Sequence, residues 1–375
     1  MKKRSILFCI NYMHTGGVEK SLLALLRALP RDRFEPHVAL MQNKGELLPD
    51  IPSDVPVHIL RSIEREKPRL GFPLRHATDI AGPLSYLAAK VRGTLIPYYR
   101  HILGDRRDIS RHFDIAVSYQ GPSQLLDWYV PTHIDADVYV SWVHFDLARS
   151  FVNPRTQRAV YPLYKRIFIV SESARDSFCR IFPDFTDHTD VFHNLVDATH
   201  VRTMSQAYEV ERPEGAAIIC TVGRMTTQKA PDIAIRVAAE LKLRGMKFRW
   251  YWVGADEMLE PCRREAEKTG VADSLHFVGL KSNPYPYMAA ADVYVQPSRW
   301  EGYCITLAEA RAFGLPTVCT DFAGAEQTAG LPNAQIVKSL NPAELAGAIV
   351  RGVAMPRLEV PDSVTVNDIQ KLIDL

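Results

Sequence analysis

The sequence predicts an α/β protein with two doubly wound parallel-sheet domains, and three observations support this fold class. First, short apolar runs alternate with helical patterns along the whole chain. Second, these runs are almost continuously apolar, as expected for strands that are buried on both faces of a parallel sheet. Third, the chain has 375 residues, which is more than one ordinary core accommodates. Two domains built from strand–helix units are therefore expected.

The first half of the chain predicts six strands and two helices. Its short β-rich runs predict strands at 4–10, 35–41, 55–60, 113–118, 138–143 and 167–170. Helical periodicity follows at 18–29 ("VEKSLLALLRAL") and 173–182. The first run follows a basic start that is typical of a signal peptide. However, it is only about half of the usual ~7–15 apolar residues and breaks at Asn11, so it predicts a strand.

The second half repeats the alternation more regularly. Its apolar runs predict strands at 216–222, 248–253, 275–278, 292–296 and 316–320. The segments between them have helical periodicity and predict helices at 231–244, 258–269, 284–290 and 304–313. Each of the first four strands is thus followed by a helix, which is the repeating unit of a doubly wound sheet.

The polar stretch "VDATHVRTMSQAYEVERPEG" separates the two series of strands and helices. It predicts a linker at 196–215 between an N-terminal domain, 1–195, and a C-terminal domain, 216–355. Residues 356–375 follow the C-terminal domain, with prolines at 356 and 361, and predict a detached tail helix. Such a helix could pack on either domain, so it could cross back to the N-terminal domain.

Composition excludes several classes of protein. The formal net charge of +2 is too small to indicate nucleic-acid binding. No stretch approaches the ~20 apolar residues of a membrane span. The six cysteines are scattered, without the spacing of a zinc site, and most of them lie in apolar runs. We therefore expect a cytoplasmic protein with free thiols and no metal cofactor.

One segment, 61–112, is markedly basic. It holds eleven Lys and Arg against five Asp and Glu, interleaved with Leu, Ile, Tyr and Pro. Two interpretations remain open. It forms one or two surface helices with an ordinary solvated face, or it forms a basic amphipathic patch that contacts anionic lipid headgroups.

Two loops that follow predicted strands carry residues suited to an anion. Ligands of doubly wound sheets bind beyond the carboxyl ends of the strands. After the first strand, Gly16 and Gly17 directly precede a helix, where unhindered backbone N–H groups can meet an anion. After the strand "AIICTV", Arg224 and Lys229 lie in one loop and can bind a diphosphate. Each feature alone is also typical of a structural turn or of surface charges.

The stretch "SRWEGYCITLAEARAFGLPTVCTD", residues 298–321, is the most specific signal. Glu301 and Gly302 are expected on the loop, and the helix is expected to begin near 304–306. The first-turn N–H groups of this helix would then face a phosphate. Glu309 lies one turn deeper, where a carboxylate suits ribose hydroxyls. Glu301 would repel an anion, so its partner should be a sugar hydroxyl.

These residues resemble the retaining glycosyltransferases of family 4, whose motif has two glutamates eight positions apart. The resemblance spans most of the chain and is strongest over 216–327, with pieces such as "VGRMTTQKAPDIAI" and "FAGAE". In the first half, "TGGVEKSLLALL", "SWVHFD" and "VFHNLVD" are weaker matches. The resemblance implies the B-type glycosyltransferase fold, with two Rossmann-like domains that face each other across a cleft. The N-terminal domain would be the acceptor side, and the C-terminal domain would bind the nucleotide sugar.

The resemblance also implies roles for individual residues. Arg224 and Lys229 would hold the donor diphosphate, and Glu301 would bind hydroxyls of the donor sugar. His144, which without the resemblance is an ordinary core histidine, would face the sugar and the acceptor. The catalytic set is thus His144, Glu301, Arg224 and Lys229. The substrate-binding set is Gly16, Gly17, Gly302, Tyr303, Cys304, Ile305, Thr306, Leu307 and Glu309.

The chain departs from the family pattern in three loops. Leu195 stands where a glycine is usual, the loop after Gly254 lacks the usual second glycine, and "FAGAE" keeps only one of two. We expect these differences to affect loop shape and the choice of donor. Asp135 and Asp137 form a D-x-D pattern that is typical of metal-dependent A-type enzymes, but they precede a strand and point to the wrong edge of the sheet.

The predicted function is sugar transfer from a nucleoside diphosphate sugar to a hydroxyl of a glycan or lipid-linked acceptor, with retention of anomeric configuration. UDP is the first choice of nucleotide and GDP the second. The expected setting is cell-envelope polysaccharide or lipopolysaccharide synthesis, in the cytoplasm and in peripheral contact with the inner face of the membrane through 61–112. No metal, no other cofactor and no nucleic acid is expected. The alternatives are a non-catalytic nucleotide-sugar sensor or scaffold, and a nucleotide-sugar epimerase.

Overall fold

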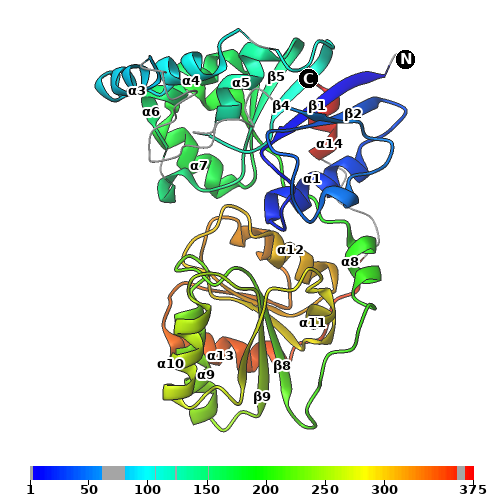
Figure 1. The fold of residues 1–375 in the computed structure, drawn as a ribbon. Helices are drawn as coiled ribbons and strands as arrows, with labels where there is room; N and C mark the ends of the chain where they lie inside the picture. The colour runs from blue at the N-terminus through cyan, green and yellow to red at the C-terminus, as the bar shows by residue number, and fades with distance from the viewer. Residues whose placement is uncertain (1–2, 61–80, 106, 123–124, 151, 361–367) are drawn as a thin grey trace. The chain divides into compact units, whose positions relative to one another are not determined.

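The computed structural model describes residues 3–60, 81–105, 107–122, 125–150, 152–360 and 368–375, and for 81–85 the backbone only. The chain forms two compact units (Figure 1). Unit 1 consists of Met1–Asn194 and Val366–Leu375, and unit 2 consists of Leu195–Thr365. The C-terminal end of the chain therefore belongs to the same unit as its N-terminal end.

Unit 1 is built on a parallel sheet of seven described strands in the order β3-β2-β1-β4-β5-β6-β7. The strands are β1 (Arg4–Ile10), β2 (Phe34–Leu40), β3 (Val57–Ile59), β4 (Phe113–Ser118), β5 (Ala136–Val143), β6 (Arg166–Ile169) and β7 (Thr189–Val191). The order of the strands reverses beside β1, which pairs with both β2 and β4. This arrangement is the doubly wound sheet that the sequence predicts, with its switch point at the carboxyl ends of β1 and β4.

The helices of unit 1 cover this sheet. They are α1 (Gly17–Ala28), α3 (Ala81–Arg92), α4 (Ile96–Leu103), α5 (Leu125–His133), α6 (Pro154–Val160), α7 (Glu172–Ile181) and α14 (Ile369–Ile373). Helix α14 is the tail helix, and the Arg4 guanidinium donates a hydrogen bond to the carbonyl of Ile373 at its end. Asp368, just before α14, accepts a hydrogen bond from the His193 ring at 2.9 Å.

Unit 2 is built on a parallel sheet of six described strands in the order β10-β9-β8-β11-β12-β13. The strands are β8 (Ala217–Val222), β9 (Phe248–Val253), β10 (Leu275–Gly279), β11 (Val293–Gln296), β12 (Thr317–Thr320) and β13 (Ala334–Val337). The helices are α8 (Ala198–Met204), α9 (Pro231–Leu243), α10 (Leu259–Thr269), α11 (Tyr285–Ala290), α12 (Ile305–Ala312) and α13 (Pro342–Val353).

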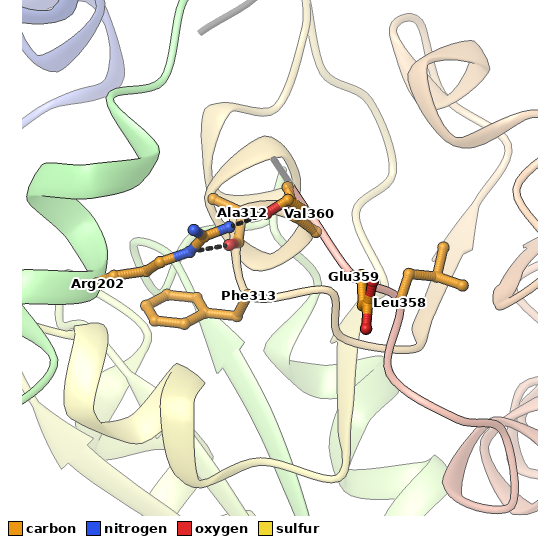
Figure 2. Close-up of a pocket in the computed structure, with 6 residues that line it drawn as sticks. All are labelled: Arg202, Ala312, Phe313, Leu358, Glu359 and Val360. Atoms are coloured by element: carbon orange, nitrogen blue, oxygen red, sulfur yellow. Dashed lines mark hydrogen bonds between the residues drawn. The ribbon is translucent and has the colours of Figure 1, made fainter. Parts of the chain in front are cut away.

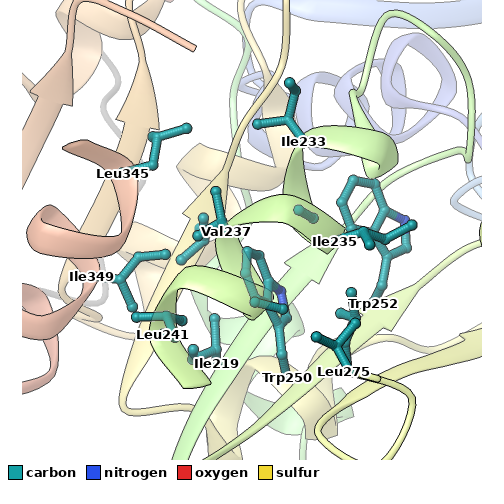
Figure 3. Close-up of a cluster of buried hydrophobic side chains, with 14 of the residues drawn as sticks. Ile219, Ile233, Ile235, Val237, Leu241, Trp250, Trp252, Leu275, Leu345 and Ile349 are labelled. Carbon is teal, nitrogen blue, oxygen red and sulfur yellow. The ribbon is translucent and has the colours of Figure 1, made fainter. Parts of the chain in front are cut away.

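Two hydrophobic layers bury the two faces of this sheet. On one face, residues of α9, α10 and α13 form one hydrophobic cluster that includes the fully buried Trp250 and Trp252 of β9 (Figure 3). On the other face, α8, α11 and α12 pack on Tyr294 and on neighbouring residues of the same strands. Because both faces are covered, the strands are apolar without alternation, as the sequence indicates.

The strands and helices predicted within the two domains are present, and their ends differ by at most two residues; of the tail helix expected within 356–375, the described residues form a helix only at Ile369–Ile373. Elements that no pattern predicts are β7, β13, α5, α6, α8 and α13. Helix α5 was missed because its residues 126–130 are all buried, which removes the amphipathic period, and because Pro131 lies inside it. The stretch 196–215 contains α8, whose Ala198 and Val201 are buried in the core of unit 2. Of the basic segment, 61–80 lies outside the described residues.

Candidate functional site

The candidate site of unit 2 lies beyond the carboxyl ends of β8 and β11, which are neighbours in the sheet. The loop after β8 carries Arg224 and Lys229, and the loop after β11 carries Glu301. The two loops are joined by a backbone hydrogen bond, in which the N–H of Arg299 donates to the carbonyl of Gln228 at 2.8 Å. Residues that are about seventy positions apart in the sequence thus meet at one edge of the sheet.

Lys229 and Glu301 form the centre of this site. The Nζ of Lys229 donates to Oε1 of Glu301 at 2.6 Å, and both side chains are largely buried. Burial alone would lower the pKa of Lys229, but the Glu301 carboxylate outweighs this effect and raises it. The lysine is therefore a stable cation, placed where it can meet a second anion.

A buried chain of hydrogen bonds from β11 and the start of its loop fixes the orientation of the Glu301 side chain. The Ser298 hydroxyl donates to Oε1 of Glu301 at 2.6 Å, and the Gln296 amide donates to the Ser298 oxygen at 2.8 Å. Gln296 is held in turn by the hydroxyl of Tyr294. From the side, the Gln228 amide donates to the other carboxylate oxygen at 3.3 Å. Sequence reasoning missed these neutral residues because it selected charged side chains.

Two residues beside the ion pair have unusual backbone conformations. Ala230 (φ 59°) and Cys304 (φ 65°) are the described non-glycine residues with positive φ. They are the N-caps of α9 and α12, so each stands where a site loop enters its helix. Such conformations cost roughly 1–3 kcal/mol each and persist where the surroundings fix the backbone. They indicate that the shape of both loops is tightly determined.

The stretch 302–307 forms the entrance to α12. Gly302 and Tyr303 lie on the loop, Cys304 is the N-cap, and Ile305, Thr306 and Leu307 make up the first turn. The helix begins where the sequence predicts it. Burial raises the pKa of the Cys304 thiol to about 12, so the thiol is neutral at pH 7.

Glu309 and Arg224 lie in contrasting environments. Glu309 is buried one turn into α12, where its Oε1 accepts a hydrogen bond from the Tyr285 hydroxyl at 2.7 Å. The Arg224 side chain is 68% exposed and lies 3.6 Å from a carboxylate oxygen of Asp256. Arg224 is nevertheless close enough to Lys229 for its charge to act on the pKa of the lysine. The structure thus joins Lys229 to Glu301 directly and leaves Arg224 at the surface beside them.

The glycine turn of unit 1 begins α1, with Gly16 as N-cap and Gly17 as the first helical residue. Gly16 has an extended backbone (φ −149°), so its φ alone does not require glycine. A Cβ at this position would lie 2.3 Å from Oε2 of Glu19, so the end of that side chain would have to shift. Burial raises the pKa of the Glu19 carboxyl to about 7. Sequence reasoning missed Glu19, although its place three residues after Gly16 is that of a capping carboxylate.

His144 of unit 1 directly follows β5 and is buried. Its ring lies 4.6 Å from that of Tyr119 and stacks on that of Trp142. Neither ring nitrogen has a hydrogen-bonding partner of normal geometry among the described residues. Burial lowers the pKa of His144 to about 3, so the ring is neutral at pH 7 and can accept a hydrogen bond from a hydroxyl group.

A cavity of about 460 Å³ lies elsewhere in unit 2, at the C-terminal end of α12 (Figure 2). Its lining consists of Arg202, Ala312, Phe313, Leu358, Glu359 and Val360. The Arg202 guanidinium donates hydrogen bonds to the carbonyls of Ala312 and Val360 and so ties the end of α12 to the segment 358–360. The candidate site is at the opposite end of the same helix, so this cavity is separate from it.

Two general features concern the described residues only. None of the helices in the described ranges is long and apolar enough to cross a membrane. The same ranges contain no group of three or more His, Cys, Asp or Glu side chains arranged to hold a metal ion.

Comparison with known proteins relates the second half of the chain to a family. Residues 206–359 match the family described as "Glycosyl transferases group 1". The chain is 35% identical over 106 residues to the lipopolysaccharide core biosynthesis mannosyltransferase LpsB of Rhizobium meliloti, a match that covers 26% of this chain and 30% of LpsB. It is 32% identical over 149 residues to D-inositol 3-phosphate glycosyltransferase 2 of Catenulispora acidiphila, a match that covers 36% of this chain and 35% of that protein. The chain thus spans about a third of the length of these relatives.

Solved structures resemble the whole chain. The structure of Anabaena Alr3699/HepE in complex with UDP has a TM-score of 0.64 at 18% identity, covering 93% of this chain and 90% of that one. The structure of WaaG, a glycosyltransferase involved in lipopolysaccharide biosynthesis, has a TM-score of 0.57 at 16% identity, with coverage of 93% and 90%. At these identities the likeness shows the fold.

Proposed function

We propose that this chain is a group 1 glycosyl transferase, which transfers a sugar from a nucleoside diphosphate sugar to an acceptor hydroxyl, because residues 206–359 match that family and the chain has the B-type glycosyltransferase fold. The observation that carries the proposal is the buried contact of 2.6 Å between Lys229 and Glu301 beside the first turn of α12. A cation and a helix N-terminus suit a diphosphate, and a carboxylate suits the sugar that is attached to it.

The favoured donor is a UDP-sugar, with a GDP-sugar as the second choice. HepE, which shares the fold, was solved with UDP and with UDP-glucose. In this chain, Lys229, Arg224 and the first-turn amides of α12 would face the diphosphate. Glu309, held by Tyr285, would accept hydrogen bonds from ribose hydroxyls. Glu301 would bind hydroxyls of the sugar, since in the part of the chain that the structure describes its Oε2 receives only the long contact from Gln228.

The proposed reaction retains the configuration of the anomeric carbon and proceeds without a metal ion. As the bond to the sugar breaks, negative charge grows on the departing diphosphate. Lys229 and Arg224 would stabilise that charge, a preorganised electrostatic contribution that is commonly worth several kcal/mol. The acceptor would attack from the same face, and the leaving phosphate would take up its proton. The neutral His144 would accept a hydrogen bond from a sugar or acceptor hydroxyl.

The proposed acceptor is a glycan or lipid-linked glycan of the cell envelope, reached from the cytoplasmic face of the membrane. LpsB and WaaG are named for lipopolysaccharide synthesis, which supports this setting. Support from the chain itself comes from α3, where Leu87 and Val91 are 57% and 80% exposed. They are four residues apart and so lie on one face of the helix. Its last turn carries Lys90 and Arg92, which suits contact with anionic headgroups.

The test is thermal-shift binding with UDP, GDP and ADP and their common sugars, in the presence of EDTA. We expect one nucleotide to raise the melting temperature of the wild type by several degrees. Lys229→Met and Glu309→Gln should lose most of this shift, because they remove a charge from the proposed contacts without a large change in shape. Lys242→Met is the matched control, because Lys242 lies near the far end of α9 and pairs with Asp273 at the surface. If no nucleotide stabilises the wild type, the proposed function is wrong.

A second measurement separates the alternatives. The protein is incubated with an acceptor extract and with the nucleotide sugar that contains the nucleotide found to bind. A transferase releases the free nucleotide and forms a product whose anomeric configuration is read by NMR. A sensor or scaffold would bind without turnover, and an epimerase would return a nucleotide that still carries a sugar. Inversion at the anomeric carbon, or loss of turnover in EDTA, would contradict the retaining, metal-independent reaction.

A further inference from the structure

The two loops that hold Lys229 and Glu301 are joined by more than the ion pair between these residues. Arg299 lies two residues before Glu301, and its guanidinium forms a fork with both carboxylate oxygens of Asp232, at 2.8 and 2.6 Å. The same guanidinium donates to the carbonyl of Thr227 at 2.9 Å. Together with the hydrogen bond from its own N–H to Gln228, Arg299 makes four bonds across the two loops.

The fork differs from an ordinary surface ion pair. Exposed pairs contribute little because the side chains move and water screens them. Here the arginine and aspartate side chains are only 25% and 32% exposed, and the contact is bidentate, which fixes direction as well as distance. Burial alone would raise the pKa of Asp232, but the hydrogen bonds and charge of Arg299 lower it. Asp232 also lies in the first turn of α9, a favourable place for a carboxylate.

The position of the fork relates it to the reacting groups. Asp232 follows Lys229 by three residues, on the far side of the strained Ala230, and Arg299 stands between Ser298 and Glu301. The fork therefore closes a ring of contacts of which the Lys229–Glu301 ion pair is the opposite side. The two loops follow different strands, β8 and β11. The fork and the ion pair therefore act together to fix the position of Lys229 relative to Glu301.

We propose that Arg299 is a positioning residue, whose fork on Asp232 holds the turn 298–301 against the loop 227–229 so that Glu301 and Lys229 keep the geometry required for sugar transfer. This inference rests on the proposed function. Arg299 itself need not touch the substrate. Its loss should lower the rate of the chemical step more than it lowers donor affinity, since misplacement by about 1 Å can cost on the order of 100-fold in rate.

The chain offers a closely matched control. Arg244, at the other end of α9, donates to Glu240 at 2.9 Å and to the carbonyl of Ala343 at 2.9 Å. The side chains of this pair are 36% and 28% exposed, so its burial resembles that of the Arg299 fork, although it reaches only one carboxylate oxygen, Oε1 of Glu240. It lies away from the candidate site, so Arg244→Ala reports the general effect of losing such a pair.

The experiment compares wild type, Arg299→Ala, Arg299→Lys, Asp232→Asn and Arg244→Ala. We expect Arg299→Ala to lower kcat by about tenfold or more, with KM for the donor changed by less than about threefold. Arg299→Lys should recover little activity, because lysine cannot form the fork. Asp232→Asn should resemble Arg299→Ala, and the double variant should be no worse than either single variant. Arg244→Ala should keep the kcat of the wild type.

Hydrogen exchange of the nucleotide-free protein supplies a readout that is independent of activity. Peptides that cover 224–230 and 297–304 should exchange faster in Arg299→Ala and not in Arg244→Ala. If wild type binds nucleotide and turns over while Arg299→Ala matches Arg244→Ala in both kcat and exchange, the positioning role is wrong and the proposed function stands. If wild type binds no nucleotide, the proposed function fails, and the role of Arg299 in transfer fails with it.

Discussion

Cys304 is a buried residue in a conformation that L-amino acids avoid. At φ 65° its Cβ approaches the backbone, which costs roughly 1–2 kcal/mol. Its backbone starts α12 directly beside Glu301, and Ala230 does the same for α9 beside Lys229. The backbone at both positions keeps this conformation where the loops that carry Lys229 and Glu301 enter their helices.

Cys304→Val should therefore destabilise unit 2 by roughly 2 kcal/mol or more, because a β-branched side chain is especially unfavourable at positive φ. Denaturant unfolding followed by fluorescence of the buried Trp250 and Trp252 measures the change. Cys220→Val is the control, since Cys220 is equally buried in the extended strand β8, where valine is well tolerated. Equal losses in both variants would mean that packing, and not the backbone of Cys304, sets the cost.

Among the described helices, α3 carries two exposed large aliphatic side chains on one face, Leu87 and Val91. Leu87→Ser with Val91→Ser should weaken binding to vesicles that contain anionic phospholipid by about tenfold, because insertion of each side chain contributes on the order of 1 kcal/mol. Co-sedimentation with vesicles measures the change, and added salt should weaken the wild type too, since Lys90 and Arg92 are nearby.

Leu243→Ser is the matched control for this measurement. Leu243 ends α9 in unit 2 and is 83% exposed, so it is an equally accessible aliphatic residue that also has cationic neighbours, Lys242 and Arg244, but lies outside α3. If the control weakens vesicle binding as much as the α3 variant does, or if the wild type does not bind vesicles, the membrane contact is wrong.

Elements that depend on a regular period were predictable from sequence, and elements that depend on tertiary contacts were not. Helix α9 has a complete periodic pattern and strand β9 is an almost continuous apolar run, and both lie where expected. Helix α5 is buried on all sides and strand β7 has three residues, so neither leaves a pattern. The same division holds in the site. The spacing of Glu301 and Glu309 is visible in the sequence, whereas the Arg299 fork joins residues 67 positions apart and appears only once the loops meet.

At the scale of the whole molecule, the tail joins the two ends of the chain within unit 1. Asp368 accepts hydrogen bonds from the backbone and the ring of His193 and from Lys371. Burial alone would raise the pKa of Asp368, but these donors outweigh it and lower the pKa to about 2. The carboxylate of Asp368 therefore stabilises the docked tail at every pH at which it is ionised.

Asp368→Asn should lower the free energy of unfolding of unit 1 by about 1–2 kcal/mol at pH 7. The folded pKa is below the unfolded value near 3.8, so this contribution is present above pH 4 and is lost as the pH falls towards 2. Measurements on wild type and variant should thus converge between pH 4 and pH 2. Asp374→Asn, in the exposed last turn of the tail, is the control. A difference that is independent of pH would show that the charge of Asp368 is not responsible.

The return of the tail has a consequence for biosynthesis. Unit 2 is continuous in sequence, whereas unit 1 needs both Met1–Asn194 and Val366–Leu375. A ribosome that releases the chain from its N-terminus presents all of unit 2 before the last part of unit 1 has left the exit tunnel. Unit 2 can thus finish folding first, whereas unit 1 must wait until Val366–Leu375 has emerged, and until then the edge around Asp190 and His193 stays uncovered. Truncation from the C-terminal end, even by ten residues, would therefore damage the half of the molecule that was synthesised first.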